Sequence, residues 1–379
     1  MSRPASILFL SSHYGIGAAE SLWLETAVHL AGQGHQVRAA VCWLKWREER
    51  VANLRHHRIP IVRLAQTWPR HRLLKPFFRS GMAERLLVGR LVRSQPPDLV
   101  LISQGNDHSC LPWIEALQEL GVPAAVVTHG VVPSDWPKDP IATRLQQAFE
   151  KLSASFWVSK RNQHDFECQT GARLRNGQCV WNPVKVLDSG IIPWPEPADE
   201  WKMACVARLQ TRPKGHDLLI QALAEPRWRG RNLTLSIFGE GENRQGLEKL
   251  ARMLGISDRV RFPGHVERVE DIWRDHHLLA QPSRNEGMPL SLIEALMCGR
   301  PALATDVAGH AEIIRDGVDG FIAEAATVRH LDEALEQAWQ RRNEWQPMGL
   351  QARDRLLNLL PADPVADFAN RLLALIPSR

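Results

Sequence analysis

The sequence predicts two doubly wound α/β domains in series, each with a parallel β-sheet covered by helices. Its 379 residues are enough for two domains of ordinary size, each with its own hydrophobic core. Short apolar runs alternate with amphipathic stretches in both halves, as in sheets built from βαβ units. A proline-rich segment at residues 190–197 separates the halves, so we expect domains at residues 1–190 and 191–360.

The expected strands are short aliphatic runs, and the expected helices have one apolar face. The first half has predicted strands at Ile7–Ser11, Gln36–Cys42, Leu99–Ser103, Ala124–Thr128 and Ser155–Val158, and helices at Glu20–Gly32 and Leu111–Leu120. The second half has predicted strands at Trp201–Val206, Leu233–Phe238, Val260–Pro263, Leu278–Gln281 and Pro301–Thr305, and helices at Asp217–Ala224, Gly246–Leu254 and Leu290–Met297. Ligands of such sheets bind beyond the carboxyl ends of the strands, so we expect the domains to face a deep cleft.

The composition, 44% hydrophobic and 23% charged, is typical of a globular protein. No apolar stretch approaches the ~18 residues of a spanning helix, and no signal peptide is recognised, so we expect a cytoplasmic protein. The six cysteines are scattered without zinc-site spacing, which indicates reduced thiols and no metal site.

The charge is concentrated at the N-terminal end. Residues 1–100 carry 15 Lys and Arg against 6 Asp and Glu, although the whole chain is only +5. The segment Arg70–Arg93 mixes cations with Phe and Leu, and such a surface can dock on anionic lipid. The alternative is a helix with one face in the core and a solvated basic face. No nucleic-acid module accompanies the charge, so nucleic-acid binding is not expected.

The first expected strand leads into a glycine loop, with Gly15 and Gly17, and then a helix, an order that suits phosphate contact. Glu20 stands where a dinucleotide fingerprint requires its third glycine, and no acidic residue ends the second strand. Nicotinamide or flavin binding is therefore not expected. A tight turn that merely needs glycine remains the alternative.

Two loops of the second half follow predicted strands in the same way. One carries Arg208, Arg212 and Lys214, whose charges suit a diphosphate, although a solvated basic loop has the same composition. The other carries Gly239 and Gly241, which permit close approach of a ligand. In the first half, His129 directly follows a predicted strand, where a histidine is either functional or structural.

The most informative stretch is residues 284–301, where Glu286 and Glu294 bracket a turn and a helix start. Backbone N–H groups at a helix start favour phosphate, and carboxylates accept hydrogen bonds from sugar hydroxyls. Ser291 and Glu294 also fit a capping box, whereas Pro289 favours an earlier start for the helix. Both interpretations of Glu294 remain open from these residues alone.

Taken in order, these motifs resemble family 4 glycosyltransferases, a retaining, nucleotide-sugar-dependent group with the GT-B fold. The resemblance covers nearly the whole chain, is strongest from Trp201 to Ala323, and is most specific in the Glu286–Glu294 pair. With it we expect a C-terminal helix in residues 361–379 that returns to the N-terminal domain. Three departures are Ala18 and Ala308, each of which stands where the family usually has a glycine, and Gly130, which follows His129 where the family often has an aspartate.

The resemblance implies a role for each matching residue. Arg208 and Lys214 would hold the donor diphosphate and neutralise the leaving group, and Glu294 would bind the ribose. Glu286, with the amides after it, would meet the donor sugar, and His129 would lie near the reaction centre. The remaining implied donor contacts are Gly15, Gly17, Gly239, Gly241, Gly264, His265, Gly287, Met288, Leu290 and Ser291.

The expected activity is retaining transfer of a sugar, of hexosyl type, from a nucleotide sugar to a glycan or lipid-linked acceptor. The resemblance places such enzymes in bacterial surface polysaccharide and glycolipid synthesis. No metal or other cofactor is expected, because the cations can stabilise the leaving diphosphate. The alternatives are a catalytically silent sugar-nucleotide-binding protein and a dehydrogenase. The sequence specifies neither the donor base nor the acceptor.

Overall fold

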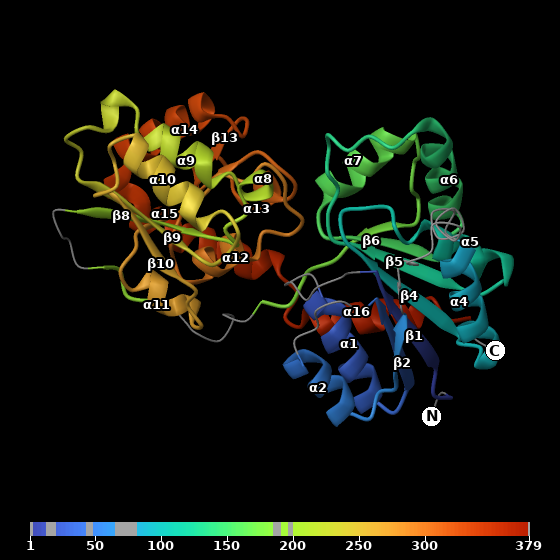
Figure 1. Ribbon diagram of the computed structural model, residues 1–379. Coiled ribbons are helices and arrows are strands. Elements are labelled where there is room, and N and C mark those ends of the chain that lie inside the picture. The colour runs from blue at the N-terminus through green and yellow to red at the C-terminus, as the bar shows by residue number, and fades with distance from the viewer. Residues whose placement is uncertain are drawn as a thin grey trace. The chain divides into compact units, whose positions relative to one another are not determined.

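The computed structural model describes residues 3–12, 20–42, 48–64, 82–184, 191–195 and 200–377. The chain forms two compact units (Figure 1). The N-terminal unit comprises Met1–Pro183 and Pro361–Arg379, and the C-terminal unit comprises Val184–Leu360. Within the described ranges, no helix has the length and apolar character needed to cross a membrane.

The N-terminal unit is built on a seven-stranded parallel sheet with the order β3-β2-β1-β4-β5-β6-β7. The strands are β1 (Ser6–Ser11), β2 (Gln36–Cys42), β3 (Ile61–Leu64), β4 (Leu99–Gln104), β5 (Ala124–Thr128), β6 (Ala154–Trp157) and β7 (Gly177–Cys179). Because β1 pairs with both β2 and β4, the direction of winding reverses at β1. That reversal is the switch point at which doubly wound sheets bind ligands.

Alternating apolar side chains of β1 face the two helical layers. Ile7 and Phe9 belong to the core shared with α1 (Ser21–Gly32) and α16 (Pro364–Ala374). Leu8 and Leu10 belong to the core on the other face. The helices of that second layer are α4 (Met82–Ser94), α5 (Leu111–Glu119), α6 (Asp139–Glu150) and α7 (Lys160–Thr170).

The C-terminal helix α16 packs in the N-terminal unit, beside α1 (Figure 1). Phe368 is fully buried and meets Phe156 of β6 edge-on, with ring centroids 5.0 Å apart. Arg371 donates to the carbonyl of Cys179 at 3.1 Å. Helix α16 therefore completes the core of the first unit.

The C-terminal unit has a six-stranded parallel sheet with the order β10-β9-β8-β11-β12-β13. Its strands are β8 (Trp201–Val206), β9 (Leu233–Phe238), β10 (Val260–Gly264), β11 (Leu278–Gln281), β12 (Ala302–Thr305) and β13 (Phe321–Ala323). Its helices are α8 (Thr211–Lys214), α9 (His216–Leu223), α10 (Arg244–Met253), α11 (Val269–Trp273), α12 (Leu290–Met297), α13 (His310–Ile313), α14 (Val328–Gln340) and α15 (Trp345–Leu359). Residues of α9, α10 and α14 share one core with the sheet, and α12 contacts β11, β12 and α15.

Two glycines allow loops of the C-terminal unit to approach closely. At Gly215 a Cβ atom would lie 1.9 Å from the carbonyl oxygen of Pro282, and φ is +64°. At Gly239 a Cβ atom would lie 2.1 Å from the carbonyl oxygen of Ala207, and φ is +123°. Only glycine fits both the left-handed backbone and the lack of space.

The substitution Gly215→Ala tests this close approach against a matched control, Gly230→Ala. Gly230 also has positive φ, +77°, but no atom lies within 4 Å of its ideal Cβ. We expect Gly230→Ala to lower the unfolding free energy by about 1 kcal/mol through backbone strain. Gly215→Ala should lower the unfolding free energy by roughly 1–3 kcal/mol more than Gly230→Ala does, because the added methyl group overpacks the loop. Urea-unfolding midpoints measure the difference, and equal losses would contradict the structure.

Candidate functional site

The carboxyl ends of β8 and β11 form the switch point of the C-terminal sheet. These strands are parallel neighbours, and the winding proceeds from β8 toward β9 on one side and from β11 toward β12 on the other. The loop after β8 leads through α8 to Lys214 and Gly215, and the loop after β11 spans residues 282–289. Ligands of open α/β sheets bind at this place.

Hydrogen bonds join the two loops. The backbone N–H groups of Arg284 and Asn285 both donate to the carbonyl of Pro213, at 2.8 and 3.1 Å. The Arg284 guanidinium donates to both carboxylate oxygens of Asp217, at 2.8 and 2.7 Å, and to the carbonyl of Thr211 at 2.8 Å. This bidentate contact holds the loop after β11 against the start of α9.

Burial alone would raise the pKa of Asp217, but the hydrogen bonds and charge of Arg284 lower it below its ordinary value. Asp217 raises the pKa of the Arg284 guanidinium in turn. Both groups are therefore charged at neutral pH.

Lys214 and Glu286 meet at the centre of the site. The Lys214 Nζ atom lies 2.6 Å from Glu286 Oε1, and the side chains are 19% and 7% exposed, respectively. The same carboxylate oxygen accepts hydrogen bonds from Ser283 Oγ at 2.7 Å and Gln281 Nε2 at 3.1 Å. Lys214 is thus the more accessible partner of a largely buried ion pair.

Burial favours a raised pKa at Glu286, but Lys214, His310 and the Ser283 hydroxyl together lower it below the ordinary value. The His310 ring is buried, which lowers its own pKa, and its Nδ1 lies 2.7 Å from the carbonyl of Thr305. A carbonyl only accepts, so Nδ1 carries the proton of that hydrogen bond. Because its own pKa is lowered, Glu286 is ionised at neutral pH and acts as a hydrogen-bond acceptor.

Burial and the neighbouring Lys214 ammonium lower the pKa of His216 to about 4. His216 is therefore neutral at physiological pH, and it adds no charge beside the Lys214–Glu286 pair.

Arg208 lies on the loop that follows β8 and is exposed. Ala207 and Leu209, on either side, donate their N–H groups to the carbonyls of Phe238 and Glu240, at 3.1 and 2.9 Å. Within the described part of the chain, the Arg208 side chain makes no hydrogen bond or ion pair. A fixed backbone therefore presents a guanidinium that can meet an anion.

The helix after Glu286 begins earlier than a capping box formed by Ser291 and Glu294 would require. α12 starts at Leu290, with Pro289 as the N-cap residue and no side-chain cap. Ser291 lies inside the helix, where its hydroxyl is 3.5 Å from Gln281 Oε1. The capping box is therefore wrong, and Glu294 lies half-buried on the second turn of α12. The proline ring favours this start because the first N–H groups of a helix have no partner within it.

The other expected donor contacts of this unit lie in loops around the same edge of the sheet. Gly239 follows β9 and donates its N–H to the carbonyl of Gly264 at 2.8 Å. Gly241 packs on Leu209, whose carbonyl oxygen would lie 2.5 Å from an added Cβ. Gly264, at the end of β10, is half-buried, and the next residue, His265, is exposed. Near the start of α12, Gly287, Met288 and Leu290 are also half-buried.

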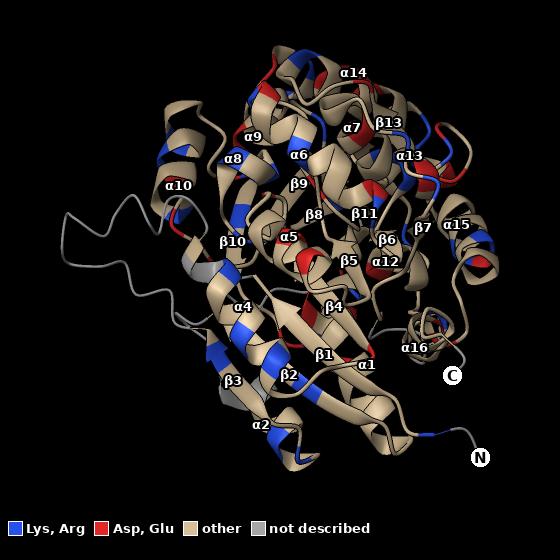
Figure 2. Ribbon diagram, turned by 90° about the vertical axis from the view of Figure 1, so that its right-hand side faces the viewer, with Lys and Arg blue, Asp and Glu red and all other residues tan. Residues whose placement is uncertain are grey.

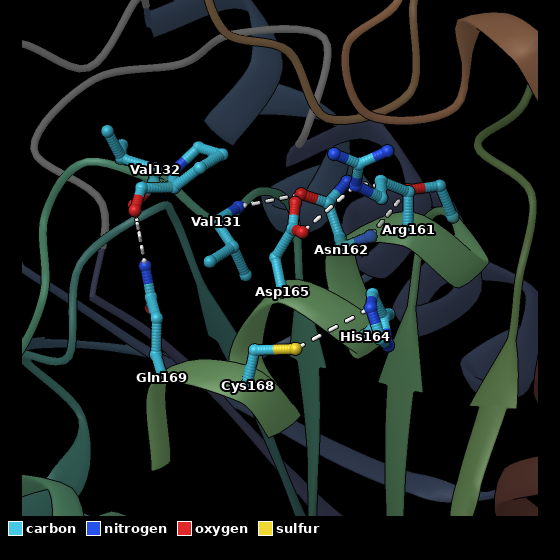
Figure 3. Close-up of polar contacts among 10 residues, drawn as sticks. Val131, Val132, Arg161, Asn162, His164, Asp165, Cys168 and Gln169 are labelled. Carbon is cyan, nitrogen blue, oxygen red and sulfur yellow. Dashed lines mark hydrogen bonds and ion pairs between the residues drawn. The ribbon is translucent and has the colours of Figure 1, made fainter. Parts of the chain in front are cut away.

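In the N-terminal unit, His129 follows β5 and is 8% exposed. Its N–H donates to the carbonyl of Gln104 at 3.0 Å, and its Nε2 lies 3.2 Å from Ser103 Oγ. Figure 3 shows how α7 holds the segment that follows. The Val131 N–H donates to Asn162 Oδ1 at 2.8 Å, and Gln169 Nε2 donates to the carbonyl of Val132 at 2.8 Å. Gly15 and Gly17 lie outside the described residues.

Sequence reasoning missed the residues that support the site. Arg284 and Asp217 hold the two loops together, and Ser283 and Gln281 donate to the Glu286 carboxylate. The nearby His310 lowers the pKa of Glu286. The adjacency of Arg284 to the glutamate motif was the available signal for one of them. Within the ranges that the structure describes, no three His, Cys, Asp or Glu side chains are grouped to hold a metal ion.

Residues 191–355 match the model of the family "Glycosyl transferases group 1". The matched segment is less than half of the chain and lies within the C-terminal unit. It contains the switch point between β8 and β11 and the Lys214–Glu286 pair.

The matches to curated relatives cover about as many residues of this chain as the family model does. The D-inositol 3-phosphate glycosyltransferase of Nocardia farcinica is 37% identical over 160 residues, which are 40% of this chain and 35% of that protein. The putative glycosyltransferase EpsD of Bacillus subtilis is 29% identical over 157 residues, 41% of each chain. The match therefore spans well under half the length of these relatives.

Solved structures match nearly the whole chain. Anabaena HepE in complex with UDP has a TM-score of 0.74 at 18% identity, over 97% of this chain and 98% of that one. The lipopolysaccharide outer core galactosyltransferase WaaB also has a TM-score of 0.74 at 18% identity, over 97% and 99% of the two chains. At this identity the likeness shows the fold, which is the predicted pair of Rossmann-like domains of the GT-B type.

The substitution Asp217→Asn tests the contact that holds the two loops together. The pKa of Asp217 is lower in the folded protein than in the unfolded chain, where an aspartate has a pKa of about 3.9. Its ion pair therefore stabilises the fold at a pH above about 3.9, and this stabilisation is lost as the pH falls through the folded-state pKa. We expect Asp217→Asn to cost about 1 kcal/mol at pH 7, because partial exposure screens the pair. The difference from the wild type should shrink as the pH falls below about 4.

The control is Asp271→Asn, which removes an exposed pair with Arg274 at 3.0 Å. It should change stability little at any pH. Urea unfolding between pH 3 and pH 7 measures both variants. A pH-independent loss at Asp217 would contradict the assigned ion pair.

Proposed function

We propose that this protein is a retaining glycosyltransferase that transfers a sugar, of hexosyl type, from a nucleotide-sugar donor to a glycan or lipid-linked acceptor. The observation that carries the proposal is the Lys214–Glu286 pair at the switch point of the C-terminal sheet, within the segment that matches the family model. A cation that is partly accessible lies there beside an ionised acceptor, which suits a ligand with both a phosphate and sugar hydroxyls.

The donor's diphosphate is assigned to the cations. Arg208 supplies a planar fork and Lys214 a mobile point charge, and the N–H groups at the start of α12 add hydrogen-bond donors. When the diphosphate takes up the Lys214 charge, Glu286 keeps its contacts to Ser283 and Gln281 and can accept from sugar hydroxyls.

The remaining roles follow from the resemblance to family 4 glycosyltransferases. Glu294, one turn into α12, is assigned to the nucleotide ribose, and the loop at Gly264 and His265 to the base. His129, which follows β5, is assigned to the transferred sugar at the reaction centre.

The proposed reaction breaks the bond between the anomeric carbon and the diphosphate oxygen on the face that the acceptor hydroxyl attacks. The leaving phosphate oxygen takes the proton of that hydroxyl, so the products are the glycoside and the nucleoside diphosphate. Arg208 and Lys214 stabilise the charge that develops on the phosphate, and no metal is required. Glu286 orients the sugar and forms no covalent bond.

The relatives and neighbours support this choice of substrates. The neighbour HepE has structures with UDP, with UDP and glucose, and with UDP-glucose. WaaB is described as a lipopolysaccharide outer core galactosyltransferase, and another relative as the Vi polysaccharide biosynthesis protein VipC/TviE of Salmonella typhi. We therefore propose a role in bacterial surface polysaccharide or glycolipid synthesis.

The substitutions Arg208→Ala and Lys214→Ala test the assignment of the diphosphate. Each should reduce turnover of a defined donor and acceptor by about 100-fold or more, because one preorganised charge is removed from the transition state. Arg229→Ala is the control, since Arg229 is exposed and precedes β9, at the opposite edge of the sheet. Intact turnover in Arg208→Ala and Lys214→Ala would refute the assignment.

A thermal-shift panel of UDP-, GDP-, ADP- and dTDP-glucose identifies the donor. The matching nucleotide sugar at 100 times its Kd should stabilise the fold by about 2.7 kcal/mol. Stabilisation without transfer or donor hydrolysis would indicate a binding protein instead of an enzyme.

We further propose that α4 brings the protein to the inner face of the membrane. On its outward face, Met82, Leu86 and Leu87 are 50%, 59% and 39% exposed, and Arg90 and Arg93 are exposed beside them. Val88 and Val92 of the same helix are buried in the core. Figure 2 shows the basic residues along α4 in blue. Residues 70–81 of the basic segment lie outside the described residues.

The double substitution Leu86→Glu/Arg90→Glu should reduce binding to anionic vesicles about tenfold or more, because it removes apolar contact and reverses a charge. Leu357→Glu, on α15, is the control, since Leu357 is 43% exposed on the other unit. Flotation with phosphatidylglycerol vesicles at low salt measures the effect. Absence of the wild type from the floating fraction would end the proposal.

A further inference from the structure

A chain of buried polar side chains runs through the carboxyl edge of the N-terminal sheet. Ser103 Oγ lies 3.3 Å from Glu20 Oε1 and 3.2 Å from His129 Nε2. Glu20, Ser103 and His129 are 0%, 2% and 8% exposed. They come from the residue before α1, from β4 and from the residue after β5, so the sheet itself brings them together.

The other carboxylate oxygen of Glu20 accepts two more hydrogen bonds. Ser11 Oγ donates to Oε2 at 2.7 Å, and Trp23 Nε1 donates to it at 2.5 Å. An indole N–H can only donate, so Oε2 must be an acceptor. Hydrogen bonds donated by Ser11 and Trp23 favour the ionised form of Glu20, in which the second oxygen, Oε1, can also only accept.

With Glu20 ionised, the hydrogen bonds from His129 to Ser103 and from Ser103 to Glu20 have one direction. An ionised carboxylate has no proton, so the single Ser103 hydroxyl proton points to Glu20. The Ser103 oxygen must then accept from His129, which requires the proton of the neutral ring to be on Nε2. The lone pair of the ring is then on Nδ1.

We propose that Glu20 and Ser103 are positioning residues that hold His129 in the tautomer with its proton on Nε2. The backbone of His129 is already held by Gln104 on one side and, through Val131, by Asn162 of α7 on the other. The Ser103 hydroxyl contacts Nε2 of the ring, and through this contact it orients the ring and sets the position of its proton.

For catalysis the inference rests on the proposed function. With the proton on Nε2, the buried Nδ1 atom of His129 can only accept a hydrogen bond, and we assign it as the acceptor for a hydroxyl of the transferred sugar. The other tautomer would present an N–H group to the same hydroxyl and reverse that hydrogen bond. The tautomer itself does not depend on any substrate.

The variant Glu20→Gln makes a directional prediction. Trp23 can only donate, so the oxygen of the new amide must take the place of Oε2 and its NH₂ group must face Ser103. Ser103 then accepts from this NH₂ group and turns its own proton toward His129. The ring must accept at Nε2, and its proton moves to Nδ1.

The experiment is NMR of ¹⁵N-histidine-labelled full-length protein at pH 8, where the histidine ring is neutral. Long-range ¹H–¹⁵N spectra distinguish the N–H nitrogen from the nitrogen that carries the lone pair, and the His129→Gln spectrum assigns the signals. We expect the wild type to have its proton on Nε2. Glu20→Gln should move it to Nδ1, and Ser103→Ala should give a mixture of tautomers.

The control is Ser155→Ala, which removes another fully buried serine of the same sheet that accepts from Trp157 Nε1 at 3.1 Å. It should leave the His129 signals unchanged. A wild-type proton on Nδ1, or the same tautomer in Glu20→Gln and Ser103→Ala as in the wild type, overturns the inference. A purely structural role for Glu20 predicts that second result, with a loss of stability only.

Kinetics separate this inference from the proposed function. Given transfer by the wild type, Glu20→Gln and Ser103→Ala should lower kcat roughly tenfold or more, with little change in the donor KM. If the wild type transfers no sugar but the tautomer still moves in Glu20→Gln, the positioning of His129 is supported and the proposed function fails. Unchanged kcat with a moved tautomer overturns the catalytic part of the inference.

Discussion

The contact of Gly215 with the Pro282 carbonyl is the constraint on which the candidate site depends. No Cβ fits between them, and the positive φ of Gly215 turns the chain from α8 into α9 at this point. The turn places Lys214 beside the loop after β11, where Glu286 lies 2.6 Å away. The contact between Lys214 and Glu286 therefore depends on a backbone requirement at Gly215.

Electrostatics then determine what the site can bind. A buried ion pair is costly to desolvate, and here Ser283 and Gln281 offset part of that cost by hydrogen bonds to Glu286. Arg284 and Asp217 form a second pair that holds the same two loops. One pair is thus structural, while the other keeps a cation within reach of solvent. An anionic ligand can replace Glu286 as the partner of Lys214 without leaving the carboxylate unsatisfied.

The main elements could be predicted from the sequence because they are apolar and regular. All the strands that we expected are present, several with the same bounds, such as Leu233–Phe238 and Leu278–Gln281. The strands β3, β7 and β13 were missed. Strands β7 and β13 have only three residues each, and two of the four residues of β3 are exposed, so its apolar pattern is weak. The start of α12 depended on whether Pro289 or Ser291 precedes it, which local preference alone left open.

Pairings between distant residues could not be predicted in the same way. Arg284 and Asp217, which form an ion pair, are far apart in the sequence and meet only in the folded protein. The same is true of the hydrogen bonds that connect Glu20 to His129 through Ser103. Glu20 was noticed only as a departure from a dinucleotide fingerprint. Ala308, which stands where a glycine was expected, has φ +47°, so the left-handed backbone is kept although the residue differs.

Hydrogen–deuterium exchange with bound donor tests the central claim, that the switch point of the C-terminal sheet binds the nucleotide sugar. The probes are UDP-, GDP-, ADP- and dTDP-glucose, each at saturating concentration. The account predicts that one of them slows exchange in residues 207–216 and 283–294, with little change in residues 226–232 at the opposite edge of the sheet. Protection of other segments alone, or of none with all four probes, would contradict it.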